Sequence, residues 1–239
     1  MRGYDEFYHH LSAEELRGKA EKSKNKSPRS RKLDPVVIQG RKIARTWWGA
    51  AWCENLERYA DYDNRIGRGK SYVRAGAVID LKMEGGTIRA RVQGSRKTPY
   101  KIEILIDPMP RDRYQAALKV FGRSIENLEA LVNGNFSSSL KSLLTDPRIG
   151  LFPKPQEIHF SCSCPDWASM CKHVAAVLYG IGSRLDDNPL LFFDMRGIDV
   201  SVFIKKTVEE KLHDMLKNAD RKSSKILDDH SAKTLFGVL

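Results

Sequence analysis

The short stretch SCSCPDWASMCKH, residues 161–173, contains three of the four cysteines of the chain and a histidine. Its spacing is Cys162-x-Cys164-x6-Cys171-x-His173. Thiolates and imidazole are the ligands that tetrahedral zinc prefers, and four protein ligands close the site against substrate. The sequence therefore predicts a structural Zn²⁺ site with these four residues as its ligands.

The flanking segments predict how these ligands are positioned. EIHFSCSC alternates as a β-strand does, so Cys162 and Cys164 point to the same side. Pro165 ends the strand, and CKHVAAVLYGIGSRL predicts a helix that begins at Cys171 and His173. Some thirty residues make too small a core alone, so we expect the metal to supply much of this segment's folding energy.

Other chemistries fit this cluster less well. An iron–sulfur cluster usually takes four cysteines, and a thiol redox pair usually shows Cys-x-x-Cys, which this chain lacks. A zinc deaminase would carry His-x-Glu together with Pro-Cys-x-x-Cys, and neither is present. The remaining alternative is a set of buried, unligated cysteines. Cys53 lies among helical core positions and is expected to be an inert thiol, and His159 has the wrong strand parity for a ligand.

Two side chains between the ligands have open roles. Trp167 either covers the metal, which we favour, or anchors a partner. Lys172 is expected to point away from its ligand neighbours, where it contacts a phosphate or nothing.

Composition and charge limit the class of protein. The chain has 239 residues, of which 41% are hydrophobic and 30% charged, as in ordinary globular proteins. It has no apolar run of membrane-spanning length, and its first residues lack the apolar region of a secretory signal. With clustered cysteines, this pattern indicates a metalloprotein of the cytoplasm. The formal charge of +11 favours contact with a polyanion such as nucleic acid.

Three alternating runs predict an antiparallel β-meander over residues 72–83, 88–94 and 100–107. Its apolar face is expected to pack on helices, while its other face is mainly basic. Four side chains are expected to form one positive surface there, or simply a solvated face: Arg74, Arg89, Arg91 and Lys101.

The preceding segment RIGRGKSYVRAG combines basic side chains with Gly67 and Gly69. Glycines let a backbone approach a phosphate closely, so this segment is a second candidate for nucleic-acid contact. Its candidate contact residues are Arg65, Arg68, Lys70 and Arg74, and Lys172 joins them from the metal segment. No Walker spacing is present.

Helices are expected on both sides of the meander. The capping-box pattern Ser12-x-x-Glu15 predicts a helix over 13–23, and the basic segment 17–32 is interpreted as a flexible arm. Trp48 and Trp52 recur at helical spacing and are expected in the core, whereas Trp47 is expected to be exposed. Further helices are predicted over 111–122, 124–132, 136–144 and 207–218, and the apolar run at 190–193 is expected to dock on the core.

The predicted fold is α+β, with four parts. They are a basic arm (1–33), an α+β domain with the sheet (34–149), a zinc finger (150–184) and a helical C-terminal segment packed on the core (185–239).

Beyond the ligand spacing, the chain resembles the prokaryotic SWIM zinc-finger proteins. SCSCPDWASMCKHVAAVLYGIG is similar to their finger, and blocks such as ARTWWGAAWCENLE, ARVQGSRKTPYKIEI and NPLLFFDMRG are similar to theirs. The resemblance covers most of residues 35–239. It implies a ββα-type finger with zinc on the four ligands, and a role in DNA binding or protein–protein contact. It also implies a Swi/Snf-type helicase as a partner.

Two functional hypotheses follow. The first is a non-enzymatic zinc protein that binds nucleic acid, DNA in the first place, as an accessory to such a helicase. The alternative is a protein-interaction module that docks on a helicase or another partner without touching nucleic acid. The sequence contains no paired carboxylates at a useful spacing and no nucleophile motif, so an enzyme is not expected.

Overall fold

The fold is built on one four-stranded antiparallel sheet in the order β1-β2-β3-β4. The structure is a computed structural model that describes residues 11–28, 32–57, 63–121, 141 and 144–219. Its strands are β1 (Val78–Glu84), β2 (Thr87–Val92), β3 (Tyr100–Ile106) and β4 (Ile158–Cys162). The predicted meander and α+β class are confirmed, and the predicted metal-segment strand is β4, paired with β3.

The two faces of the sheet differ as the alternation predicts. Ile88, Ile104 and Phe160 are aligned across three strands on the face that packs against the helices. Arg89, Glu103 and Ser161 are aligned on the opposite, open face. A tight turn at Gly85, with φ of 56°, joins β1 to β2 and uses a conformation that favours glycine.

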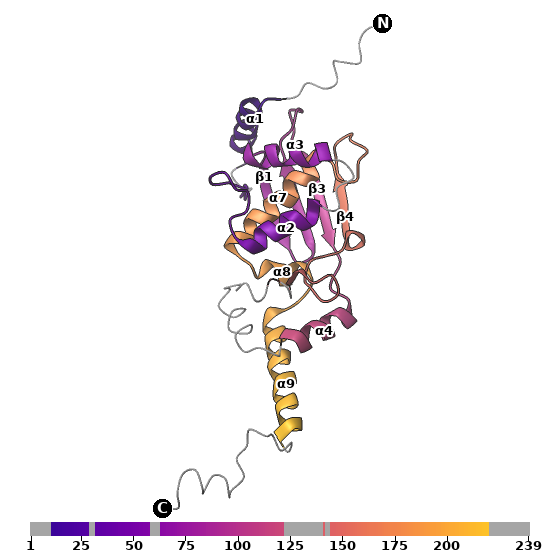
Figure 1. The fold of residues 1–239 in the computed structure, drawn as a ribbon. Coiled ribbons are helices and arrows are strands. Elements are labelled where there is room, and N and C mark those ends of the chain that lie inside the picture. The colour runs from indigo at the N-terminus through magenta and orange to yellow at the C-terminus, as the bar shows by residue number, and fades with distance from the viewer. Residues whose placement is uncertain (1–10, 29–31, 58–62, 122–140, 142–143, 220–239) are drawn as a thin grey trace, which may run out of the picture.

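One helix, α7 (Lys172–Asp187), lies across the inner face of the sheet and is the centre of the fold (Figure 1). It contacts all four strands, while α2 (Trp47–Glu57) and α3 (Asp63–Arg74) pack on it from the other side. Eleven of its 16 residues are buried, so it is a core helix rather than an amphipathic surface helix.

Helix α3 corrects the prediction for RIGRGKSYVRAG. These residues were expected to include a glycine-rich phosphate loop followed by the start of a strand, but residues 63–74 are helical and β1 begins only at Val78. Gly69 is needed for packing: a Cβ there would lie 2.5 Å from the Cβ of Ala175 in α7. The glycine therefore serves close helix contact instead of phosphate approach.

Helix α2 is held on α7 by polar contacts as well as by packing. The indole N–H of Trp52 donates to Leu178 O (2.9 Å), and that of Trp48 donates to Leu185 O (2.8 Å). The buried carboxylate of Asp186 accepts from the Thr46 backbone N–H, and Thr46 Oγ1 in turn accepts from the Gly49 N–H, which caps the start of α2. Trp52 is fully buried, as expected for the core. Trp47 was expected to be exposed, but it is half-buried with its ring edge-on to Trp48 at 5.5 Å.

Helix α1 (Ala13–Asn25) confirms the predicted N-terminal helix and its capping box. The flexible-arm interpretation of residues 17–32 is wrong for residues 17–25, which belong to this helix. Leu16 and Ala20 are buried, and the Lys19 ammonium donates to Ser95 O (2.7 Å) in the loop between β2 and β3. Although only two residues of α1 are buried, the hydrogen bond from Lys19 to Ser95 O helps to hold the helix on the domain.

The lower end of the molecule contains α4 (Arg111–Phe121), the short helix η2 (Pro155–Glu157), α8 (Leu191–Met195) and α9 (Val200–Ala219) (Figure 1). Glu157 pairs there with two buried guanidinium groups, Arg113 and Arg196, each at 3.0 Å. The apolar 190–193 run docks as expected, with Phe192 and Phe193 buried. The helix predicted over 207–218 is part of α9, and four of its apolar side chains are exposed: Val208, Leu212, Met215 and Leu216. The helices predicted at 124–132 and most of 136–144 lie outside the described residues.

Two glycines of α3 provide a matched test of this packing. Gly69→Ala should reduce the free energy of unfolding by roughly 1–3 kcal/mol, because the new methyl group must separate α3 from α7. Gly67→Ala should instead raise it by roughly 0.5–1 kcal/mol, since its Cβ meets nothing within 4 Å and alanine favours a helix. Urea unfolding of both variants measures the difference. Equal effects at the two positions would contradict the close contact.

Candidate metal centre

The structure brings all four predicted ligands together. The sulfur atoms of Cys162, Cys164 and Cys171 and a ring nitrogen of His173 all lie within 4.8 Å of one another. His173 Nδ1 is 4.0 Å from Cys162 Sγ and 3.9 Å from Cys171 Sγ. Around a tetrahedral zinc ion, bonds of ~2.3 Å to sulfur and ~2.0 Å to nitrogen separate ligand atoms by about 3.5–3.8 Å. The cluster is therefore close to the size that a tetrahedral ion needs and can hold a metal ion.

Strand β4 and helix α7 present the ligands from two sides. Cys162 ends β4 on the face turned toward the helices, where its strand neighbour is Ile102 of β3. Cys171 is the N-cap residue of α7, with extended backbone at φ −71° and ψ 167°. This extended residue lets the chain turn, so that Cys171 and His173 face back toward the end of the strand.

Aromatic rings fix the orientation of His173. Its imidazole lies 4.2 Å from the ring of Tyr100 and meets Tyr72 edge-on at 5.4 Å, measured between ring centroids. Nδ1 faces the sulfur atoms, whereas Nε2 is buried and has no hydrogen-bond partner in the described part of the chain. Burial lowers the pKa of His173, which favours the neutral imidazole that a metal ligand must be.

The three thiols influence one another's ionisation. Hydrogen bonds from Cys162 and then from Cys171 lower the pKa of Cys164, and the Asp166 backbone N–H adds to this effect. Hydrogen bonds with Cys164, which has the larger effect, and with Cys171 raise the pKa of Cys162. The cluster is thus arranged so that thiols stabilise a neighbouring thiolate. A divalent cation among the three sulfurs favours the thiolate form of each.

The loop between the second and third ligands is tied to α3. Arg65 contacts the Asp166 carboxylate through two nitrogen–oxygen pairs at 3.2 and 3.3 Å. The same carboxylate accepts a hydrogen bond from the Ala168 backbone N–H at 3.3 Å. Arg65 was predicted as a nucleic-acid contact, and the structure gives it this ion pair instead of a free charge.

Trp167 does not cover the metal, which corrects the favoured interpretation. Its side chain is 78% exposed, whereas Ala168 beside it is buried. Lys172 is half-buried. Burial lowers the pKa of its ammonium, and the charge of Arg68 adds to this effect. Because Gly69 packs on Ala175, Arg68 lies near the first turn of α7, which contains Lys172.

The other predicted nucleic-acid contacts lie in separate places. Arg89, Arg91 and Lys101 share the open face of the sheet as predicted, and Arg89 pairs with Glu103 at 3.0 Å. Arg74 is not on that face, because it ends α3. Lys70 pairs with Glu57 of α2 at 2.8 Å. The predicted set therefore belongs to three regions: the sheet face, the α2–α3 contact, and the metal end with Arg68 and Lys172.

Two residues predicted to lie outside the ligand set do so. His159 is on the open face of the sheet, where Nε2 is 3.2 Å from the Asp107 carboxylate. Cys53 is buried in α2, and burial raises the pKa of its thiol to about 12, as expected for an inert thiol.

Sequence reasoning missed the groups that surround His173. Tyr72 was assigned to a strand, and Tyr100 was not singled out. Arg96 was also missed; its guanidinium lies over the Tyr100 ring at 5.4 Å from the centroid. The contacts of Tyr72 and Tyr100 with His173 join segments far apart in the chain, so no local pattern predicts them. Arg96 lies only four residues before Tyr100, but its position matters only because Tyr100 reaches His173.

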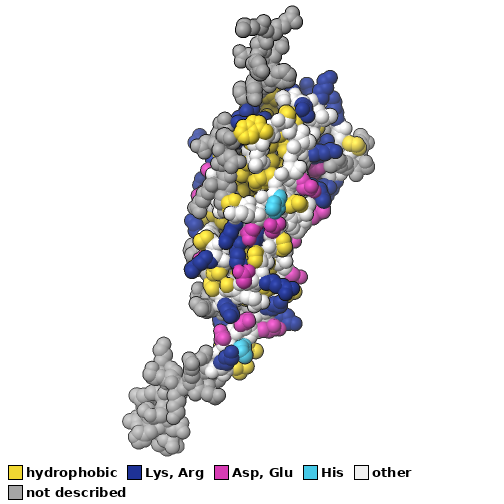
Figure 2. Space-filling view, turned by 90° about the vertical axis from the view of Figure 1, so that its right-hand side faces the viewer, with side chains coloured by type: hydrophobic (Ala, Val, Ile, Leu, Met, Phe, Trp, Pro, Cys, Tyr) yellow, Lys and Arg dark blue, Asp and Glu magenta, His cyan; other side chains and the backbone are white. Residues whose placement is uncertain are grey.

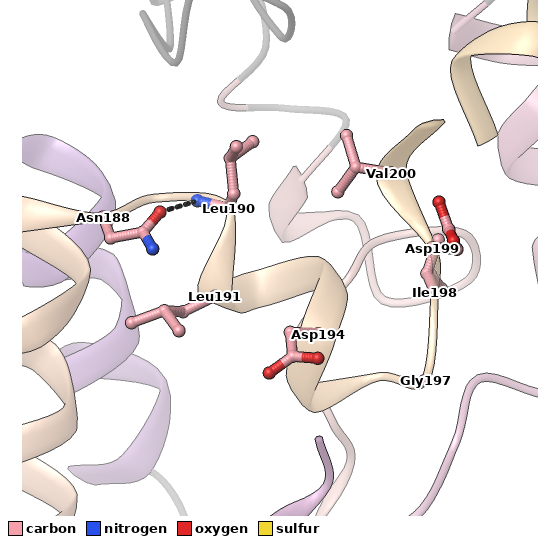
Figure 3. Close-up of a pocket in the computed structure, with 8 residues that line it drawn as sticks. All are labelled: Asn188, Leu190, Leu191, Asp194, Gly197, Ile198, Asp199 and Val200. Atoms are coloured by element: carbon pink, nitrogen blue, oxygen red, sulfur yellow. Dashed lines mark hydrogen bonds between the residues drawn. The ribbon is translucent and has the colours of Figure 1, made fainter. Parts of the chain in front are cut away.

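A pocket beside α8 does not extend the metal centre. It has a volume of about 560 Å³ and lies in the 188–200 segment (Figure 3). Its two carboxylates are occupied: Asp194 accepts from the Gly85 N–H, and Asp199 accepts from the Val202 N–H. Within the described ranges, no other group of three or more His, Cys, Asp or Glu residues is close enough to hold a metal ion. No helix in those ranges combines the length and apolar character needed to cross a bilayer.

Comparison with known proteins gives one informative similarity. The chain is 33% identical over 156 residues to the uncharacterized protein Rv2102 of Mycobacterium tuberculosis (strain ATCC 25618 / H37Rv). The aligned region covers 65% of this chain and 56% of that protein, so the chain spans little more than half of its relative. No family profile and no solved structure matches the chain. The similarity assigns no activity.

Metal binding should depend on the cluster and not on the fourth cysteine. Cys171→Ser should lower the zinc content from about one ion per chain toward zero after dialysis, because the site loses a buried thiolate. Cys53→Ala, which removes a buried thiol remote from the cluster, should leave the metal content unchanged. Elemental analysis with thiol titration measures both.

The same variant tests how far the fold depends on the metal. The sheet, α2 and α3 bury α7 independently of the cluster. Cys171→Ser should therefore retain most of its far-ultraviolet circular dichroism, contrary to the expectation that the metal supplies much of the folding energy of residues 158–182. Loss of the helical signal would show that the earlier expectation was right.

Proposed function

We propose that this chain is a non-enzymatic zinc protein that binds nucleic acid, DNA in the first place, through the basic end that carries the metal centre. The observation that carries this proposal is the set of basic side chains around the cluster. Lys172 lies between Cys171 and His173 at the start of α7, and the packing of Gly69 on Ala175 brings the neighbouring Arg68 to the same end of the helix. Arg96 lies over Tyr100, which in turn stacks on the ligand His173. A metal site that organises clustered cations is suited to phosphate contact.

Zinc is the proposed metal because three thiolates and one imidazole suit it best. The chemistry of the site also supports a structural role. Four protein ligands fill a tetrahedral ion and leave no position for a water molecule or substrate. Cysteine ligands must remain reduced, which supports a cytoplasmic location.

A Swi/Snf-type helicase is proposed as the partner on the SWIM-type ligand spacing and sequence blocks alone. A second candidate function, docking on a partner protein without nucleic-acid contact, is favoured by a different feature. The apolar face of α9 exposes between 50% and 63% of each of four side chains, Val208, Leu212, Met215 and Leu216. Exposed apolar surface of this kind is typical of protein interfaces.

Salt dependence of binding tests the proposed function. Fluorescence anisotropy with labelled DNA should show affinity that falls steeply with salt, since each neutralised phosphate releases counterions. Arg68→Gln combined with Arg96→Gln should reduce the slope of log K against log[salt] by about 1 for each charge removed. Arg148→Gln removes an 88% exposed charge away from the metal centre and should leave the slope nearly unchanged.

Two results would overturn the proposal. One is the absence of DNA and RNA binding at low salt by the zinc-loaded protein. The other is binding that is unaffected by the paired arginine variant. A helicase complex that survives high salt and nuclease treatment would then favour the protein-interaction function.

A further inference from the structure

The loop between Cys164 and Cys171 presents an exposed tryptophan at the edge of the metal centre. Trp167 is 78% exposed, in contrast to Trp52, which is fully buried, and to Trp47 and Trp48, which are half-buried. An indole carries a large apolar surface, so a native fold that leaves most of this surface accessible to solvent forgoes considerable burial energy. Such exposure indicates a surface that binds something.

This exposure does not come from a loose segment. The residue before Trp167 is held by Arg65 of α3, and the residue after it is buried. The loop also begins and ends at ligands of the same cluster. The backbone that carries the indole is therefore fixed at several points. A preorganised anchor loses little conformational entropy on binding.

Basic side chains lie near the loop that carries this indole. Arg65 of α3 contacts Asp166, the residue before Trp167, and Arg68 lies one helical turn further along α3. The packing of Gly69 on Ala175 places Arg68 near the first turn of α7, where Lys172 lies. Viewed from the side of β4, Lys and Arg side chains lie along the whole visible face, including its upper end, whereas acidic side chains lie mainly in its middle and lower parts (Figure 2).

We propose that Trp167 is a base-stacking residue, and that the metal loop binds single-stranded nucleic acid with Arg68 and Lys172 on the adjacent phosphates. This inference rests on the proposed function and adds the strand type and the residue that selects it. An aromatic ring among cations is the usual arrangement of sequence-tolerant single-strand sites. In a duplex the base faces are already stacked on one another, so a loop indole cannot reach them without unstacking.

A protein partner would use the same tryptophan differently. Interface hot spots are buried aromatic residues in apolar surroundings that exclude water. Here the indole is flanked by charged groups, and the exposed apolar face of α9 lies at the other end of the molecule (Figure 1). Charge complementarity therefore favours a polyanion at Trp167.

The test compares strands and variants on the zinc-loaded full chain. An oligothymidylate of roughly 12 nucleotides should bind more tightly than a duplex of the same length and should quench the fluorescence of the exposed tryptophan. Trp167→Ala should weaken oligothymidylate binding about 5- to 150-fold and leave duplex binding nearly unchanged. Trp167→Phe should restore part of the affinity, because phenylalanine retains a stacking face.

Two controls separate stacking from damage to the site. The zinc content of Trp167→Ala should equal that of the parent chain, and Leu216→Ala, which trims a 63% exposed apolar side chain on α9, should not alter binding.

The possible failures are distinguishable. Salt-dependent binding to both strand types that Trp167→Ala does not change would overturn the stacking role and leave the proposed function standing. No binding to either oligonucleotide would overturn both. If Trp167→Leu restored the affinity as well as Trp167→Phe does, Trp167 would belong to an apolar interface. The same conclusion would follow if Trp167→Ala disrupted a protein complex and left oligothymidylate binding unchanged.

Discussion

The whole structure depends on the burial of α7 between the sheet and the helices α2 and α3. A helix covered on both sides needs small residues where other backbones cross it. Gly182 provides one such position, since a Cβ there would lie 2.7 Å from Cys53 Sγ, and Ala175 meets Gly69 at the other crossing. These contacts fix the axis and the start of α7. Because Cys171 and His173 stand at that start, helix packing determines where half of the metal ligands lie.

The other half of the ligand set depends on sheet register. Cys162 is paired with Ile102 of β3, so its position follows from hydrogen bonding along the edge strand. A shift of one residue would turn its sulfur to the open face, where His159 and Ser161 lie. The metal centre is therefore a junction between two elements that the core already positions. This explains why the ligand atoms converge although the connecting loop itself is short and irregular.

Local patterns were sufficient for much of the fold and for all four residues of the candidate metal cluster. Alternation gave β2, β3 and β4, and the apolar residues of 174–181 gave α7, because both patterns report burial directly. The ligand spacing was informative because few chemistries use three thiols and an imidazole so close together. By contrast, Gly67 and Gly69 suggested a loop, although both lie in helix α3. A Cβ at Gly67 would meet nothing within 4 Å, whereas Gly69 packs closely on Ala175. The presence of a glycine does not by itself show whether the position needs an unusual backbone conformation or only room for a neighbouring helix to pack closely.

Trp167 and α1 show why surface roles are harder to predict. Whether the Trp167 indole covers the cluster depends on the path of the six residues between Cys164 and Cys171. That path depends in turn on the ion pair between Asp166 and Arg65, which are 101 positions apart in the chain. The docking of α1 likewise depends on Ser95 and Gln93, which accept from Lys19 and Ser23. Neither contact has a periodic signal.

The chemistry of the centre also constrains its surroundings. Three thiolates exceed the charge of a divalent ion by one, so the centre itself is anionic once loaded. Lys172, which lies between two cluster residues, brings a positive charge close to this centre, whereas the Arg65–Asp166 pair adds no net charge. Arg96, above Tyr100, adds a further cation near His173. Because Tyr100 also stacks on His173, the loop that carries Arg96 is positioned against the imidazole of the cluster, so a change in the orientation of His173 would reach this cation through one aromatic ring.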